Sequence, residues 1–261
     1  MVADAREHEL GRNLAAVRER LDAACQAAGR DSSEVTLIVV TKTYPASDVI
    51  RLASLGVADI GENRDQEAAP KAAEVAAKGV AIRWHFVGQL QRNKSRSVAR
   101  YADMVHSVDS VRLAQALGAA ARRERDRPID VLVQVSLDGD ATRGGAVPGV
   151  GSDGVASGGI AAAGIAAGGG ERDVALDDVL AAVAAEDALT LRGLMAVAPL
   201  EWEPERAFAD LASIATRVRA GYPRATVISA GMSSDVEQAI QYGATHVRIG
   251  SAVLGNRASL M

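Results

Sequence analysis

A lysine at the end of an apolar run is the first residue of this sequence that could carry out chemistry. Lys42 follows residues 37–40, which are four consecutive apolar β-formers, and Thr41. Such a run predicts a buried strand, and an amine that loses contact with water is easier to deprotonate and more nucleophilic toward an aldehyde. We therefore expect Lys42 to be shielded from bulk water. The alternative is a lysine that reaches past the strand end and pairs with a carboxylate.

Two short Gly/Ser motifs near the other end of the sequence could bind an anion. SAGMSSD (229–235) contains Gly231 for an unusual backbone angle, with Ser233 and Ser234 as N-cap candidates for the next helix. RIGSA (248–252) exposes backbone N–H groups at Gly250 and Ser251. Small residues let the backbone itself approach a phosphate, and loops after the last strands of an α/β barrel often do so. The alternative for each motif is ordinary capping and a tight turn.

Further polar groups lie at or just after predicted strands. Arg248 stands between Val247 and Ile249, so it needs a fixed partner, which could be a carboxylate or a ligand acceptor. Asn63 follows a short strand in the sequence IGEN, and the neighbouring Glu62 could pair with one of the basic groups. His85 lies within WHFVG, and a satisfied core histidine is the favoured interpretation over a catalytic base.

These groups need a scaffold of alternating strands and helices, and the sequence has that rhythm. Eight short β-branched runs alternate with Ala/Leu-rich helical stretches, which predicts parallel pairing with right-handed crossovers. Eight such strands in 261 residues suit one (β/α)8 TIM barrel preceded by an extra helix. Because the second and fourth strands are short, a doubly wound open sheet remains the alternative. The expected strands are 36–40, 59–61, 83–87, 104–108, 130–135, 191–197, 226–229 and 246–249, and the expected helices are 4–29, 47–55, 65–78, 92–100, 110–125, 176–187, 203–220 and 234–242.

Composition excludes several other classes of protein. The net charge of −4 and the aromatic content of 3% give no basic surface or stacking platform, so we expect no nucleic-acid or membrane partner. Cys25 is the single cysteine, and no His/Cys cluster has metal-ligand spacing. The polar, acidic residues 1–10 do not resemble a signal peptide, so we expect a cytoplasmic protein.

One Gly-rich stretch interrupts the pattern. Of the 25 glycines, 12 fall within residues 139–170, directly after the fifth expected strand. Such a stretch can bury little, so we expect a flexible loop insertion in a single domain that covers 1–261. In a barrel this loop would overhang the face where ligands bind, and the alternative is an insertion without a function.

Taken together, seven blocks of this sequence resemble the pyridoxal phosphate homeostasis protein family, whose barrels bind pyridoxal 5′-phosphate (PLP) and are related to the N-terminal domain of alanine racemase. The blocks run in the family's order along nearly the whole chain. The Gly-rich stretch is the departure, because Thr142 and Arg143 stand where the family has a short loop with a Ser-Lys or similar pair. The blocks are TKTYP (41–45), GEN (61–63) with Gln66 and Glu67, WHFVGQLQRNK (84–94), SVD (107–109), GLMAV (193–197), SAGMSSD (229–235) and RIGSAVLG (248–255).

The resemblance implies a cofactor and a role for particular residues. Lys42 matches the lysine that holds PLP as a Schiff base, and Asn63 matches a residue beside the ring. Arg248 matches the arginine that faces the pyridine nitrogen. The phosphate-binding positions are matched by Ser233, Gly250 and Ser251.

A permanently charged guanidinium cannot accept a proton, so an arginine at the ring nitrogen weakens the cofactor as an electron sink. The resemblance therefore implies a monomeric, non-catalytic protein of PLP homeostasis that hands PLP to PLP-dependent apoenzymes. A small PLP enzyme such as a weak amino-acid racemase is the alternative. Racemases of this class use a tyrosine from a second domain, which we do not expect here because the sequence stops at Met261. A barrel that serves only as an interaction module is the third possibility.

Overall fold

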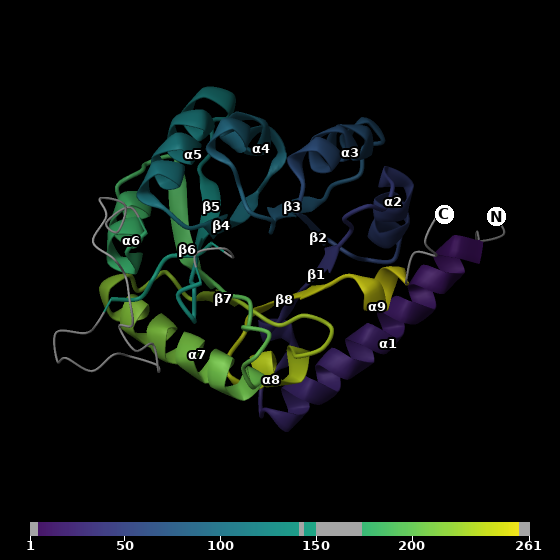
Figure 1. Ribbon diagram of the computed structural model, residues 1–261. Coiled ribbons are helices and arrows are strands. Elements are labelled where there is room, and N and C mark those ends of the chain that lie inside the picture. The colour runs from purple at the N-terminus through teal and green to yellow at the C-terminus, as the bar shows by residue number, and fades with distance from the viewer. Residues whose placement is uncertain (1–4, 141–143, 150–173, 256–261) are drawn as a thin grey trace.

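Eight parallel strands form a closed barrel in which neighbours in sequence are neighbours in space (Figure 1). The computed structural model describes residues 5–140, 144–149 and 174–255. Pairing between β1 and β8, from Thr36 opposite His246 to Val39 opposite Ile249, closes the ring. The expected barrel is therefore confirmed, and the open sheet is excluded. The strands are β1 (Thr36–Val40), β2 (Asp59–Glu62), β3 (Arg83–Phe86), β4 (Met104–Val108), β5 (Ile129–Gln134), β6 (Leu189–Met195), β7 (Val227–Ser229) and β8 (His246–Ile249).

Helices surround the barrel, as expected from the alternation of the sequence. The expected strands 36–40, 104–108 and 246–249 agree with the structure residue for residue, and the other five differ at each end by two residues or fewer. The expected helix 92–100 begins instead as a 3-10 turn over Arg92–Lys94. The helices are α1 (Ala5–Ala27), α2 (Ala46–Ser54), α3 (Asp65–Ala77), α4 (Ser95–Tyr101), α5 (Val111–Glu124), α6 (Leu176–Ala184), α7 (Pro204–Gly221), α8 (Val236–Gln241) and α9 (Ser251–Leu254).

Side chains alternate along the strands and so divide the apolar core into two parts. Residues that point outward, such as Val105, Val133 and Ile228, pack under the helices in the large core cluster. Those that point inward include Met104, Leu132, Met195 and Val227, which form a separate small cluster inside the barrel. The interior also contains the buried polar residues His85, His106, Ser229 and Arg248.

The extra N-terminal helix is bound to the outside of the barrel beside α8 and α9 (Figure 1). Arg20 donates to the Ser233 carbonyl at 2.7 Å and pairs with Glu237. Asn13 donates to the Val253 carbonyl at 3.0 Å. Helix α1 therefore supports the two segments that follow β7 and β8.

Part of the Gly-rich stretch 139–170, residues 144–147, is held by backbone hydrogen bonds. Ala146 is fully buried, its N–H donates to the Gln134 carbonyl at 2.7 Å, and its own carbonyl accepts from Ser136. A Cβ on Gly145, whose φ is 116°, would lie 2.6 Å from the Ser136 nitrogen. The expectation of a loop that buries little is thus wrong for residues 144–147, since glycine lets this segment pair closely beside the end of β5. Thr142, Arg143 and residues 150–170 lie outside the described residues.

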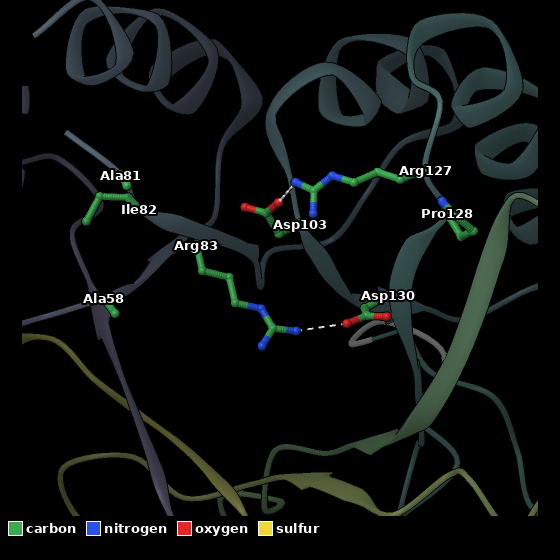
Figure 2. A pocket seen from close by; sticks show the side chains of 8 residues that line it. All are labelled: Ala58, Ala81, Ile82, Arg83, Asp103, Arg127, Pro128 and Asp130. Atoms are coloured by element: carbon green, nitrogen blue, oxygen red, sulfur yellow. Dashed lines mark hydrogen bonds and ion pairs between the residues drawn. The ribbon is translucent and has the colours of Figure 1, made fainter. Parts of the chain in front are cut away.

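A pocket of about 390 Å³ opens at the amino-terminal mouth of the barrel (Figure 2). Its charged groups neutralise one another: Arg83 pairs with Asp130 at 2.8 Å, and Arg127 pairs with Asp103. Surface pairs of this kind contribute little stability. The pocket lies at the opposite mouth from the residues that the sequence marks for chemistry.

Gly193 tests the packing of the sheet. It adopts φ 151° at the irregular pairing of β6, and a Cβ there would lie 1.9 Å from the Val227 carbonyl oxygen. We expect Gly193→Ala to lower the free energy of unfolding by about 2 kcal/mol or more, because neither strand can retreat. Urea denaturation measures this value. The control is Gly221→Ala, where a Cβ meets nothing within 4 Å, and an equal loss in the control would contradict the packing argument.

Candidate functional site

The sequence-predicted site residues lie at the carboxyl-terminal mouth of the barrel. Lys42 follows β1, Asn63 follows β2, Ser233 follows β7, and Gly250 and Ser251 follow β8. These four strands are consecutive around the closed barrel. Since parallel strands all end at the same mouth, residues from both ends of the sequence share one edge of the molecule.

Backbones approach closely at this edge, and small residues permit it. A Cβ on Gly250 would lie 3.2 Å from the Val40 carbonyl oxygen, so the segment after β8 lies directly against the end of β1. Gly231 adopts φ 89° and accepts a hydrogen bond from the Arg248 nitrogen at 3.0 Å. The unusual angle expected at Gly231 is confirmed.

Lys42 lies in a tight turn and its side chain is exposed. The expectation that Lys42 is shielded from water is therefore wrong, because β1 ends at Val40 and Lys42 lies in the turn that follows the buried Thr41. Thr43 adopts φ 67°, a left-handed conformation that is uncommon for a threonine. A constrained turn thus presents a solvent-accessible amine.

Helix α3 holds this turn from both sides. The Thr43 N–H donates to Glu67 Oε2 at 2.9 Å, and Lys71 Nζ donates to the Thr41 carbonyl at 2.8 Å. Since a left-handed threonine costs energy that the surrounding structure must supply, these two contacts explain why the turn persists. The position of Lys42 therefore depends on α3.

A buried ion pair lies beneath the turn. Lys71 Nζ lies 2.5 Å from Glu62 Oε1, and the same oxygen accepts from the Thr41 hydroxyl at 2.6 Å. Both side chains are almost completely buried. Burial raises the pKa of Glu62, and the hydrogen bonds from Lys71 and Thr41 oppose the rise. The basic partner expected for Glu62 is thus Lys71.

Arg248 is buried inside the barrel. Its guanidinium donates to Ser229 Oγ at 2.6 Å and to the Ala196 carbonyl at 3.0 Å. Within residues 5–140, 144–149 and 174–255, no carboxylate lies at ion-pair distance from it. Burial lowers the pKa of Arg248 to about 10, opposed by Asp235, so the group remains charged at neutral pH. A charged donor whose direct partners are neutral is suited to a ligand acceptor.

Backbone N–H groups without acceptors follow β7 and β8. In the described part of the chain, the amides of Ser233, Ser234, Gly250 and Ser251 donate no hydrogen bond. The N-cap expected at Ser233 or Ser234 is wrong, because α8 begins at Val236 and Asp235 takes the cap position. The Asp235 carboxylate instead accepts from the Met232 N–H at 2.6 Å and fixes the loop.

Asn63 offers a further polar atom. Its Oδ1 is buried and has no hydrogen-bond partner within the part of the chain that the structure describes. A buried amide oxygen of this kind is costly unless a ligand or water satisfies it. Gly88 packs against the Asn63 backbone so closely that a Cβ would lie 2.1 Å from its carbonyl oxygen.

Sequence reasoning missed Lys71 and His106, which are both buried. The burial of Lys71 could have been predicted, because Ala68, Lys71, Ala72 and Val75 have the spacing of a buried helix face. His106 lies inside β4 and is fully buried. His85, expected as a satisfied core histidine, has both ring nitrogens hydrogen-bonded, to Asp59 and to His106. In the described residues, no group of His, Cys, Asp and Glu could hold a metal ion.

An exposed primary amine, a row of free backbone N–H groups and a buried guanidinium fit a phosphorylated aldehyde that carries an aromatic nitrogen. The fold and site thus define a barrel of the PLP-binding class. The family model for the alanine racemase N-terminal domain matches residues 12–154.

Similar proteins narrow the class. The pyridoxal phosphate homeostasis protein of Mycobacterium tuberculosis (strain ATCC 25618 / H37Rv) is 44% identical over 269 residues, which cover 97% of this chain and 94% of that protein. The protein of the same name from Escherichia coli (strain K12) is 36% identical and covers 96% and 97%. The solved structure of PipY from Synechococcus elongatus PCC7942 with PLP bound has a TM-score of 0.71 and 29% identity, over 94% of this chain and 100% of PipY. The chain belongs to the pyridoxal phosphate homeostasis protein family.

The buried pair under the turn gives a testable pH dependence. Lys71→Met leaves Glu62 buried without a cation, so we expect the free energy of unfolding to fall by about 3–5 kcal/mol at pH 8. Removing Lys71 raises the pKa of Glu62 further, because one of the groups that lower it is lost. A carboxyl whose folded-state pKa is raised takes up protons more readily in the folded state, so the deficit should shrink between pH 8 and pH 5. Urea denaturation at both pH values measures it.

The matched control is Lys78→Met, at an exposed lysine that follows the last residue of the same helix. Its stability should change little at either pH. A deficit in Lys71→Met that is the same at pH 5 and pH 8 would contradict the assignment of Glu62 as the buried charge.

Proposed function

We propose that this protein binds PLP as a Schiff base on Lys42 and acts in PLP homeostasis, as a carrier that releases PLP to PLP-dependent apoenzymes. The observation that carries the proposal is the meeting of the Lys42 turn with the Gly250–Ser251 segment at one mouth of the barrel. The exposed Lys42 and the amides of Ser233, Gly250 and Ser251, which donate no hydrogen bond among the described residues, follow strands that end at this same mouth, and this supports one site for a small molecule. A role as a monomer and a location in the cytoplasm remain predictions from the sequence.

Each part of the cofactor has a suitable partner among the described residues. The free amides of Ser233, Gly250 and Ser251 suit the phosphate, because backbone N–H groups bind anions without a bulky side chain. Asn63 has an unsatisfied amide oxygen for the ring edge. Arg248 supplies a charged donor for the pyridine nitrogen. Bound PLP would supply an aldehyde and an electron-withdrawing ring.

The environment of these residues favours holding PLP over catalysis. Arg248 can donate a hydrogen bond to the ring nitrogen but cannot accept its proton, so the ring stays a weak electron acceptor. Tyr44, the tyrosine nearest to Lys42 in the sequence, donates its hydroxyl to the Gly255 carbonyl at 2.7 Å. Its hydroxyl proton is thus already used, which disfavours a role as an acid or base. These features support a non-catalytic protein.

The attachment site is tested with sodium borohydride, which fixes a Schiff base covalently. Peptide mass spectrometry should find the pyridoxyl adduct on Lys42 in the wild-type protein. Lys42→Ala should lose the adduct and keep its unfolding free energy, because the side chain is exposed and has no packing role. Lys78→Ala, at another exposed lysine, is the control and should retain the adduct. An adduct mainly on Lys71, Lys78 or Lys94 would overturn the assignment.

The absence of catalysis is tested by solvent deuterium exchange at the α-carbon of L-alanine. This assay detects proton abstraction even without inversion. We expect exchange no faster than with free PLP at the same concentration, since loss of a general base alone costs about 10²–10⁴-fold. Turnover of about 1 s⁻¹ or more, absent in Lys42→Ala, would establish a weak amino-acid racemase or a related enzyme instead of a carrier.

A further inference from the structure

A continuous chain of hydrogen bonds crosses the barrel interior and ends at Arg248. Asp59 Oδ1 lies 2.8 Å from His85 Nε2, and His85 Nδ1 lies 2.9 Å from His106 Nε2. His106 Nδ1 lies 2.9 Å from Ser229 Oγ, which accepts from Arg248 Nη1 at 2.6 Å. Asp59 is the first residue of β2, so the chain starts near the amino-terminal mouth and reaches the guanidinium.

The hydrogen bonds of this chain are buried, so an unmatched donor or acceptor in it would be costly. His85, His106 and Ser229 have exposures of 0–1%. The remaining inward-facing residues of the barrel include the apolar cluster of Met104 and its neighbours. A polar chain in such surroundings is stabilising only when every donor and acceptor is matched. The arrangement of its hydrogens therefore matters.

The two ends give the chain a direction. Arg248 can only donate, and an ionised Asp59 can only accept. If both histidines are neutral, Ser229 donates its one hydroxyl hydrogen to His106 Nδ1. His106 then donates from Nε2 to His85 Nδ1, and His85 donates from Nε2 to Asp59. Every bond thus points from Arg248 toward the carboxylate.

In the alternative arrangement, where the bonds between His85 and Ser229 are reversed, one hydrogen-bond donor is left without an acceptor. If His85 carried a second proton, it would donate to both Asp59 and His106, and His106 would donate to Ser229. Ser229 Oγ would then accept twice, from His106 and Arg248. Among residues 5–140, 144–149 and 174–255, no other acceptor is available for its hydroxyl hydrogen. A buried unpaired hydroxyl hydrogen disfavours this arrangement.

We propose that Asp59, His85, His106 and Ser229 are positioning residues, which hold the Arg248 guanidinium toward the cofactor ring through a one-way chain of hydrogen bonds. The inference rests on the proposed function, because Arg248 is assigned there to the ring nitrogen. The chain links Arg248 to the Asp59 carboxylate, with which it makes no direct pair. Two of the five N–H bonds of Arg248 are used by Ser229 and Ala196, which leaves three for a ligand.

Other charged and titratable groups face the chain from neighbouring strands. Arg83 and His246 lie near Asp59 and His85, and Asp235 lies near Arg248. The His246 ring centroid is 6.3 Å from that of His85, and its Nδ1 contacts Thr245, outside the chain. Burial lowers the pKa of His106 well below its ordinary value, with His85 and Arg248 as further causes. These surroundings agree with a neutral His106.

The direction of the chain is tested by ¹⁵N NMR of histidine-labelled protein without ligand at pH 7. The sequence has four histidines, so His85→Gln and His106→Gln suffice to assign the two signals. We expect both rings to be neutral and protonated at Nε2. A His106 ring protonated at Nδ1, or a His85 ring protonated at both nitrogens, would overturn the proposed direction.

The positioning role is tested by ligand affinity in two variants. Asp59→Asn removes the charge at the far end, and Ser229→Ala removes the link to Arg248. Both should bind PLP about tenfold more weakly, as is typical when an outer partner of a binding group is lost. Asp103→Asn is the matched control, because Asp103 lies at the same mouth and pairs with Arg127 outside the chain. The control should stay within about twofold of the wild type.

Pyridoxine 5′-phosphate, which has no aldehyde, separates this inference from the Schiff base. We expect Asp59→Asn and Ser229→Ala to bind it about tenfold more weakly as well, because Arg248, and not Lys42, contacts the ring nitrogen in this proposal. Affinities in Asp59→Asn and Ser229→Ala equal to that of Asp103→Asn would overturn the positioning role. If the wild-type protein binds neither ligand, the proposed function fails, while the NMR measurement still decides the direction of the chain.

Discussion

The pairing of the first strand with the last is the constraint on which the site depends. Four residue pairs between β1 and β8 close the barrel. Closure brings the Val40 carbonyl within 3.2 Å of where a Cβ on Gly250 would lie. Without this pairing, the lysine turn and the segments after β7 and β8 would be separate features about 200 residues apart in the sequence. The site is therefore a property of the closed ring and of no single segment.

Two buried cations beside this site are stabilised in different ways. Lys71 has its carboxylate in direct contact, at 2.5 Å from Glu62, and the pair supports the turn that carries Lys42. Arg248 contacts only neutral oxygens, and its nearest connected carboxylate is three side chains away. A cation in direct contact with a carboxylate, such as Lys71, is neutralised by that partner. A cation without such a contact, such as Arg248, keeps most of its N–H donors available to a ligand. Lys71 thus has a structural role beneath the turn. Arg248 keeps N–H donors that a ligand could use.

Much of the fold could be predicted from local sequence. Short runs of β-forming residues indicated the strands at 36–40, 104–108 and 246–249, although 104–108 includes His106 and 246–249 includes His246 and Arg248. The start of α8 was misplaced, because the Asp235 side chain binds the Met232 N–H, a choice between competing local hydrogen bonds that the sequence SSD leaves open. The exposure of Lys42 was also missed, since an apolar run does not show where the chain turns.

The missed site residues depend on long-range contacts. His106 interacts with residues 21 and 123 positions away, and no local pattern brings those partners together. The helical spacing places Lys71 on the buried face of α3, but it does not show that Glu62 is the partner of Lys71. The Gly/Ser motifs after β7 and β8 were chosen as phosphate-binding candidates from their place in the expected barrel, and the resemblance to one family supported this choice. Spacing within each motif was compatible with ordinary turns.

The closure of the ring also sets when the protein can begin to act during its own synthesis. A ribosome releases β1 and the Lys42 turn early and β8 last, because chains emerge from the N-terminus onward. Until residues 246–251 emerge, β1 has no partner on one side and the mouth that carries the Lys42 turn is open. The complete mouth, with the segments after β1 and β8 side by side, thus exists only after the last strand has joined the ring.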